Sequence, residues 1–296
     1  MLGGVLCFSS SSSLVKWADT SGAAVAFWRL LFSAVLWWIV LGLRRARSGT
    51  PLPSAATWKL MLPVAVFFGL NLTVFFTAIP RTSIAHAEFI TALSPLVLVP
   101  AGALFFGERP DTRALLWGLV TVAGLAVVLF TGGDQGGATV GGDLLIVGVV
   151  ALWAGYLLTA RRARATIGLV DFMSTLMNLA FLVAVPVTAA LAGSDLWHMT
   201  TKGWIVSGLL SVMTGMLAHG FIASAQRAVD VGTISILQVS QPAIAVAWGF
   251  VILGEAIEPI QVPGMLLVII GLVAFTVVSQ RRASAGRAAD ALGHGS

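Results

Sequence analysis

The sequence predicts an all-α integral membrane protein with ten transmembrane helices, built from two halves that repeat each other in opposite orientations. Composition is the first observation: of 296 residues, 58% are hydrophobic and only 10% are charged, and the mean hydropathy is +0.96. Soluble domains carry about 25% charged residues, so this chain has too little charge to cover a globule of its size. The second observation is a series of apolar segments of membrane-spanning length, and the third is an internal repeat.

The predicted spans follow from the lengths of the apolar segments. A helix needs about 17–25 residues to cross the hydrocarbon core of a bilayer. Ten segments reach this length, at residues 2–18, 23–43, 59–79, 83–106, 114–131, 142–160, 169–192, 204–224, 231–253 and 261–279. The polar stretches between them are too short to hold a separate soluble domain. After Ser279 the chain is rich in arginine, alanine and glycine, which predicts a disordered cytoplasmic tail over residues 281–296.

The distribution of lysine and arginine predicts the orientation of the spans, because cytoplasmic loops carry an excess of both residues. With the N-terminus inside, 13 of the 17 basic residues fall on the cytoplasmic side, three fall outside and Arg29 lies within a span. We therefore expect a multi-pass protein of the cytoplasmic membrane with both termini in the cytoplasm. The basic residues lie in short loops and form no extended face, so the net charge of +5 does not predict a nucleic-acid partner.

An internal repeat relates the two halves of the chain. A shift of 147 residues superimposes, without a gap, Pro95 on Pro242, Gly102 on Gly249, Gly107 on Gly254, Glu108 on Glu255, Gly124 on Gly271 and Leu125 on Leu272. The predicted domains are a first five-helix repeat over residues 1–132 and a second over residues 140–280. Because five is odd, the second repeat enters the membrane in the opposite orientation. Inverted repeats commonly hold a substrate near the bilayer midplane, although duplication also builds scaffolds that do not transport.

Metal, redox and catalytic sites are not indicated. Cys7 is the single cysteine, which excludes an internal disulfide or a thiolate cluster, and the four histidines lie far apart. There is no H-E-x-x-H motif and no G-x-x-x-x-G-K-[ST] loop, so the sequence predicts neither a zinc protease nor ATP hydrolysis. We expect no cofactor and no catalytic residue. An intramembrane enzyme, a channel and a non-transporting scaffold are the alternatives to a transporter.

Several residues together resemble a known family pattern: Lys16, Arg29, Pro95, Gly107-Glu108, Gly118 and Gly124 in the first half, and Pro242, Gly254-Glu255, Gln261, Gly264 and Gly271 in the second. The pattern is similar to that of the EamA family in the drug/metabolite transporter superfamily, and the resemblance extends over residues 4–280. It implies two inverted five-helix halves around a central cavity, and a secondary transporter that moves small metabolites or drugs, with export as the implied direction. Two departures are a run of five serines, Ser9 to Ser13, and the presence of His86 and Glu88 in the fourth span.

A polar stripe in the fourth span is the main candidate for the substrate pathway or for ion coupling. Glu88, Thr91 and Ser94 recur at helical spacing and share one face. The shift of 147 residues gives their counterparts in the ninth span, which are Ser235, Gln238 and Gln241. A lipid-facing surface would not carry polar groups at the same register in both halves, so we expect both stripes to face one cavity. The alternative is hydrogen bonding between packed helices.

Glu88 is the one acidic residue clearly inside a predicted span. A charged group in the membrane is costly unless it faces a cavity or finds a partner. In a cavity, Glu88 could carry a coupling proton, since burial favours the neutral carboxyl, or it could bind an ammonium group of the substrate. Alternatively it pairs with Arg29, which lies at a matching depth in the second span. Such a pair would lock an outer gate, or would only neutralise two charges so that both insert.

Four further residues are candidates for the same pathway. Asn71 in the third span and Asn178 in the seventh could each bind substrate or join two helices. Trp153 and Tyr156 are three residues apart and share a face of the sixth span. They could form a stacking wall for the substrate, although packing between helices is the simpler role.

Prolines and charged residues near the span ends complete the expectations. Pro95 and Pro242 are predicted hinges, because each removes a helix hydrogen bond at an equivalent position of the two halves. At the outer ends of their spans, Lys16 is expected to extend to the surface and His86 to lie at the interface. Glu255 is expected to stabilise the N-terminus of the helix that follows it.

The predicted function is therefore a secondary transporter that works by alternating access, with proton coupling through Glu88 as one option. The expected partners are the lipid bilayer and a small-molecule substrate, and the sequence also permits a homodimer. A flux that saturates, and that a second ligand inhibits by competition, would distinguish a transporter from a channel.

Overall fold

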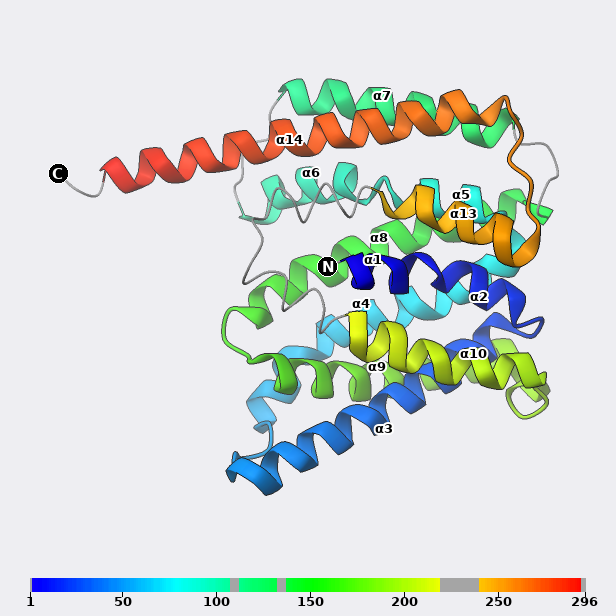
Figure 1. The fold of residues 1–296 in the computed structure, drawn as a ribbon. Coiled ribbons are helices and arrows are strands. Elements are labelled where there is room, and N and C mark those ends of the chain that lie inside the picture. Colours follow the sequence, from blue (N-terminus) through cyan, green and yellow to red (C-terminus); the bar gives the residue numbers. More distant parts are fainter. Residues whose placement is uncertain (1, 107–111, 132–136, 219–239, 294–296) are drawn as a thin grey trace.

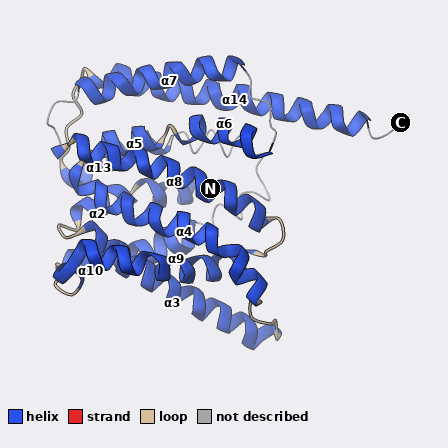
Figure 2. Cartoon of the chain, turned by 180° about the vertical axis from the view of Figure 1, so that it is seen from behind, coloured by secondary structure: helices blue, strands red, loops and turns tan. Residues whose placement is uncertain are grey.

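The computed structural model describes residues 2–106, 112–131, 137–218 and 240–293, and the regular structure in these ranges is entirely helical. The long helices run along one common direction and form a stack of layers (Figure 1). Figure 2 shows the same stack from behind, with loops at the helix ends and no strand in the described residues. The predicted all-α class is confirmed for these ranges.

The helices follow one another in the order of the predicted spans. They are α1 (Leu2–Ser9), α2 (Ser11–Trp17), α3 (Gly22–Ser48), α4 (Ala55–Ala78), α5 (Ile84–Thr91), α6 (Ser94–Phe106), α7 (Thr112–Thr131), α8 (Val140–Arg164), α9 (Leu169–Ala192), α10 (Thr201–Val212), α13 (Gln241–Leu253) and α14 (Gln261–Gly293). A 3₁₀ helix, Ile79–Arg81, follows α4, and another, Gly193–Leu196, follows α9. A π-helical segment, Met213–Leu217, continues α10.

Six of the described helices are long and apolar enough to cross a membrane: Gly22–Ser48, Ala55–Arg81, Arg113–Thr131, Val140–Arg164, Leu169–Leu196 and Gln261–Ser279. They coincide with the second, third, fifth, sixth, seventh and tenth predicted spans. The shorter apolar helices Ile84–Leu98 and Gln241–Leu253 lie in the fourth and ninth. These segments give the chain the character of an integral membrane protein.

Two spans that the sequence predicts as continuous helices are interrupted in the structure. The first is divided at Ser10, between α1 and α2, and the fourth is divided between α5 and α6. Pro95 explains the second break, because proline cannot donate to the carbonyl of Thr91 and its ring crowds that turn. The hydroxyl of Ser94 donates to the Thr91 carbonyl instead, at 2.5 Å.

The two predicted hinge prolines lie at the starts of helices. Pro95 is the second residue of α6, and Pro242 lies in the first turn of α13. A proline in the first turn removes no helix hydrogen bond, because the first amide groups of a helix have no partner within it. The equivalence of the two positions agrees with the sequence shift, and the break before α6 falls in the middle of the fourth predicted span. The hinge role of both prolines stays a prediction.

The helices α7 and α14 lie side by side at one edge of the bundle, and α3 lies at the opposite edge (Figures 1 and 2). A Cβ atom on Gly124 would lie 2.8 Å from the carbonyl oxygen of Gly264, and one on Gly271 would lie 2.9 Å from the backbone nitrogen of Thr121. These distances leave no room for a side chain, so the two backbones approach closely through glycine, as is common between membrane helices.

The C-terminal helix continues beyond its predicted span. The sequence predicts a disordered tail over residues 281–296, whereas α14 remains helical to Gly293 and its last turns project from the bundle in Figure 1. Alanine and arginine, which are abundant in this segment, are among the best helix formers.

Candidate substrate cavity

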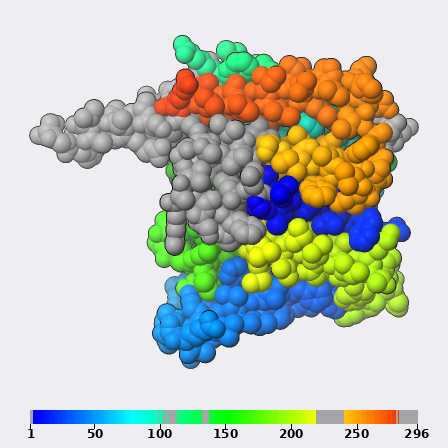
Figure 3. Space-filling view, in the orientation of Figure 1, coloured from blue at the N-terminus to red at the C-terminus, as the bar shows by residue number. Residues whose placement is uncertain are grey.

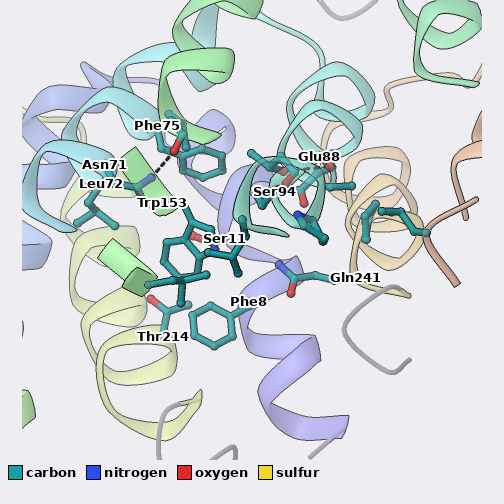
Figure 4. A pocket seen from close by; sticks show the side chains of 18 of the residues that line it. Phe8, Ser11, Asn71, Leu72, Phe75, Glu88, Ser94, Trp153, Thr214 and Gln241 are labelled. Atoms are coloured by element: carbon teal, nitrogen blue, oxygen red, sulfur yellow. Dashed lines mark hydrogen bonds between the residues drawn. The ribbon is translucent and has the colours of Figure 1, made fainter. Parts of the chain in front are cut away.

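A cavity of about 510 Å³ lies inside the helix bundle, and side chains from both predicted halves line it. Most of its lining is apolar, with phenylalanine, leucine and Trp153 prominent. Its polar groups come from helices far apart in the sequence, as the positions of Glu88, Thr214 and Gln241 show in Figure 4. Both the volume and the combination of an apolar wall with a few polar groups are typical of small-ligand sites.

Nine of the residues that the sequence predicts for the pathway or its hinges line this cavity: Arg29, Asn71, Glu88, Thr91, Ser94, Pro95, Trp153, Gln241 and Pro242. Ser235 and Gln238 lie outside the described residues. Tyr156 is buried behind Trp153, with ring centroids 4.9 Å apart, and it also packs against Phe68. Asn178 donates to the Ser174 carbonyl of its own helix at 2.8 Å.

The carboxylate of Glu88 receives a hydrogen bond from the first predicted span. Glu88 on α5 is 5% exposed, and the hydroxyl of Ser12 on α2 donates to its Oε1 atom at 2.6 Å. Ser11 lines the cavity beside it. Within the run of five serines, the structure thus places Ser12 against Glu88 and Ser11 at the cavity, a choice that helical spacing alone did not make. A space-filling view shows α1 and α2 between α10 and α13, so this span contacts the second half directly (Figure 3).

Arg29 on α3 faces the same cavity from another side. Its side chain is 3% exposed, its Nη2 atom donates to the hydroxyl of Thr214 at 2.7 Å, and its guanidinium carbon lies 5.4 Å from the ring centroid of Phe76. Arg29 and Glu88 do not form an ion pair in the structure. The direct pair that sequence depth suggested is thus absent, and both charges instead border one cavity.

The other polar residues of the lining are held by neighbouring backbone groups. The hydroxyl of Thr91 donates to the Ala87 carbonyl at 2.9 Å, one turn earlier in α5. The amide of Asn71 on α4 donates to the Val149 carbonyl on α8 at 2.8 Å (Figure 4). Asn71 therefore joins two helices, which was one of its two expected roles, and also borders the cavity.

At the end of the bundle that the basic-residue pattern places outside, a group of polar contacts joins the two halves. The ammonium group of Lys16 lies 2.5 Å from Glu255 Oε1 and donates to the Thr82 carbonyl at 2.7 Å. The Oε2 atom of Glu255 accepts from the backbone amide of Ile84 at 2.9 Å. Lys16 is thus paired and not extended to the surface, and Glu255 caps α5 of the first half and not the helix that follows it.

The same end contains a second set of contacts. The hydroxyl of Thr82 donates to Asp143 Oδ1 at 2.5 Å, and the Nδ1 atom of His86 lies 3.0 Å from Asp143 Oδ2. His86 is only 4% exposed, so it is buried against α8 and is not an interfacial residue. Lys16, Thr82, His86, Asp143 and Glu255 together are called the outer-end cluster below.

The described residues contain no group of three histidine, cysteine or acidic side chains that could hold a metal ion. The charged groups at the cavity, a guanidinium and a carboxylate, are instead suited to ionic groups of an organic ligand.

Comparisons with known proteins agree with the membrane fold. The model of the EamA-like transporter family matches residues 1–130 and 140–277. The chain is 28% identical over 223 residues to the threonine/homoserine exporter RhtA of Salmonella typhimurium, covering 73% of this chain and 72% of that protein. It is 23% identical over 277 residues to the pseudopaline exporter CntI of Pseudomonas aeruginosa, covering 91% and 92%.

A solved crystal structure has a similar fold, with a TM-score of 0.63 and 18% sequence identity over 95% of this chain and 96% of that one. At this identity the likeness concerns the fold alone. The two family matches together include most of the sequence. The chain belongs to the EamA-like transporter family.

Proposed function

We propose that the protein exports a small polar metabolite across the cytoplasmic membrane, by alternating access to the cavity described above. Family membership supports transport, and the observation that carries the proposal is one cavity lined by charged and polar groups from both halves. The names of the two relatives support export, and one of them supports an amino acid as the substrate. Both termini would lie in the cytoplasm, as the basic residues predict.

The proposal includes ten transmembrane helices in two inverted repeats, over residues 1–132 and 140–280. In support, several helix contacts occur in pairs that the shift of 147 residues interchanges. The helix α4 packs on α9 as α10 packs on α3, and α8 packs on α6 as α13 packs on α2 and α1. Two further contacts join an element to its own counterpart: α3 with α9 and α7 with α14. A pseudo-two-fold axis between the halves accounts for both kinds of contact.

The described conformation is proposed to be closed to the outside. The outer-end cluster ties the first half to the second through contacts of Lys16 with Glu255 and of His86 with Asp143. The cavity reaches Ser279, which lies at the predicted cytoplasmic end of the tenth span. Substrate would therefore enter from the cytoplasmic side, and rearrangement of the outer-end cluster would release it outside.

The test of this function compares metabolites in the medium of cells that overproduce the protein and of cells with an empty vector. The proposal predicts that one or a few compounds accumulate outside only when the protein is present. In proteoliposomes, the same compound should then show saturable counterflow. An excess of unlabelled compound should inhibit the flux of the labelled compound by competition. Absence of any enriched compound would argue against export, and a flux that does not saturate would favour a channel.

A further inference from the structure

Arg29 has hydrogen-bond donors that no described residue satisfies. Of its guanidinium nitrogens, Nη2 donates to Thr214, whereas Nε and Nη1 have no acceptor among the described residues. The side chain is almost completely buried, and it borders the cavity. A buried charge with unpaired donors is unfavourable on its own, and an anionic group of a ligand would supply the missing acceptors.

The surroundings of Arg29 fix the guanidinium in one orientation. The hydroxyl of Thr214 donates to the Leu210 carbonyl at 2.8 Å, so its oxygen is left to accept from Arg29. The ring of Phe76 packs against the guanidinium, and Thr214 lies in the π-helical segment, a type of distortion frequent at functional sites. A held guanidinium presents a planar set of donors that matches a carboxylate.

Glu88 supplies the opposite charge at another wall of the cavity. Its Oε1 atom accepts from Ser12, and its Oε2 atom accepts no hydrogen bond from the described residues. An ammonium group of a ligand would donate to this oxygen. The wall includes the apolar side chains of Leu72, Phe75 and Trp153, which would contact the uncharged part of the ligand.

We propose that the cavity binds an amino acid as a zwitterion, with its carboxylate on Arg29 and its ammonium group toward Glu88. This inference rests on the proposed function and adds the chemical class of the substrate and its orientation. Each ionic group of the ligand would meet an opposite charge, and the net charge of the cavity would not change on binding. A ligand with only one ionic group would leave either Arg29 or Glu88 unpaired, which is the basis of the selectivity.

The test measures binding to the purified protein in lipid nanodiscs by isothermal titration calorimetry. The probes are L-threonine and L-leucine, each compared with its amino alcohol, which lacks the carboxylate, and with its N-acetyl derivative, which lacks the ammonium group. For at least one of the two amino acids, the dissociation constant should be lower than that of both analogues by a factor of about 30 or more. This is the effect expected when a buried charge pair loses one partner. This comparison uses the wild-type chain, so it does not depend on whether a variant folds.

Two variants assign the contacts. Arg29→Gln should abolish the preference for the amino acid over the amino alcohol, and Glu88→Gln should abolish the preference over the N-acetyl derivative. Arg44→Gln is the matched control, because Arg44 lies on the same helix as Arg29 but pairs with Asp171 at 2.5 Å and does not line the cavity. It should retain both preferences.

Equal binding of amino acid and amino alcohol to the wild type, or binding of no probe, would overturn the zwitterion site. Loss of all binding preferences in Arg44→Gln as well would also count against it. If export of a compound without a carboxylate were then found, the proposed function would stand and only this inference would fail. If no compound were exported at all, the proposed function itself would fail.

Discussion

The ammonium nitrogen of Lys16 lies 2.5 Å from a carboxylate oxygen of Glu255, so an ion pair ties the end of α2 to the loop after α13. The second oxygen of Glu255 accepts from the backbone amide of Ile84, at the start of α5. One carboxylate thus connects the first, fourth and ninth predicted spans. In the proposed cycle, this connection breaks whenever the cavity opens to the outside.

Glu255→Gln should therefore favour the outward-open state. Removal of the charge weakens the pair with Lys16, and a partly exposed ion pair is worth up to about 1 kcal/mol, or up to about a fivefold change in population. The measurement places a cysteine at Ser94 in a Cys7→Ala background and follows its labelling by a membrane-impermeant maleimide added outside. Labelling should become several-fold faster.

Arg44→Gln in the same background is the control for that measurement. It breaks the pair with Asp171 at the opposite end of the bundle, so it should not accelerate labelling from outside. Equal acceleration in both variants, or none with Glu255→Gln, would contradict the assignment of the outer-end cluster as the outer closure.

Gly124→Leu should destabilise the protein strongly. A Cβ atom at this position would already lie 2.8 Å from the Gly264 carbonyl oxygen, so a larger side chain must separate α7 from α14. Overpacking of this kind costs about 1–3 kcal/mol or more, visible as a lower melting temperature in detergent. Gly148→Leu is the control, because a Cβ atom there meets nothing within 4 Å. A comparable loss in both variants would disprove the close contact.

Ser12→Ala should slow transport without unfolding the protein. The change removes the hydroxyl that donates to Glu88. A hydrogen bond to a charged group is worth about 1.5–3 kcal/mol, which corresponds to a transport rate lower by at least about tenfold. The measurement is the initial rate of counterflow in proteoliposomes with equal amounts of protein. Ser9→Ala is the matched control, since that hydroxyl donates to the Leu6 carbonyl of its own helix. Wild-type rates in Ser12→Ala would show that this contact has no functional role.

Asp143→Ala should lower the stability of the folded state. The carboxylate of Asp143 accepts from Thr82 and contacts the buried ring of His86, so its removal leaves buried polar groups without a partner. The expected decrease is about 1–3 kcal/mol in the free energy of unfolding, measured by thermal denaturation. Asp195→Ala in an exposed 3₁₀ helix should change the melting temperature little, and an equal decrease there would contradict the account.

Local patterns in the sequence predicted much of the fold. Runs of apolar residues gave spans such as 169–192, which matches α9, because helix length and side-chain hydropathy are local properties. Helical spacing selected Glu88, Thr91 and Ser94, and the shift of 147 residues added Gln241. All four residues line one cavity. The break before α6 lies next to Pro95, where the sequence predicted a hinge but not two separate helices.

Contacts between distant spans could not be predicted in the same way. The sequence shows that Lys16 and Glu255 lie near membrane surfaces, but hydropathy does not specify which charged residues meet. Depth alone suggested that Arg29 pairs with Glu88, whereas packing directs Arg29 to Thr214 and Glu88 to Ser12. Rotation of each helix about its axis decides these partners, and that rotation is set by tertiary packing.

The most direct test of the cavity as the substrate pathway is export by Glu88→Gln. Wild type, Glu88→Gln and the control Glu258→Gln, whose residue lies outside the cavity, would be produced at equal membrane abundance and their media compared. The account predicts that compounds enriched by the wild type are also enriched by Glu258→Gln but fall by at least about tenfold with Glu88→Gln. Equal enrichment by all three proteins would contradict it and would leave Glu88 with only a structural role.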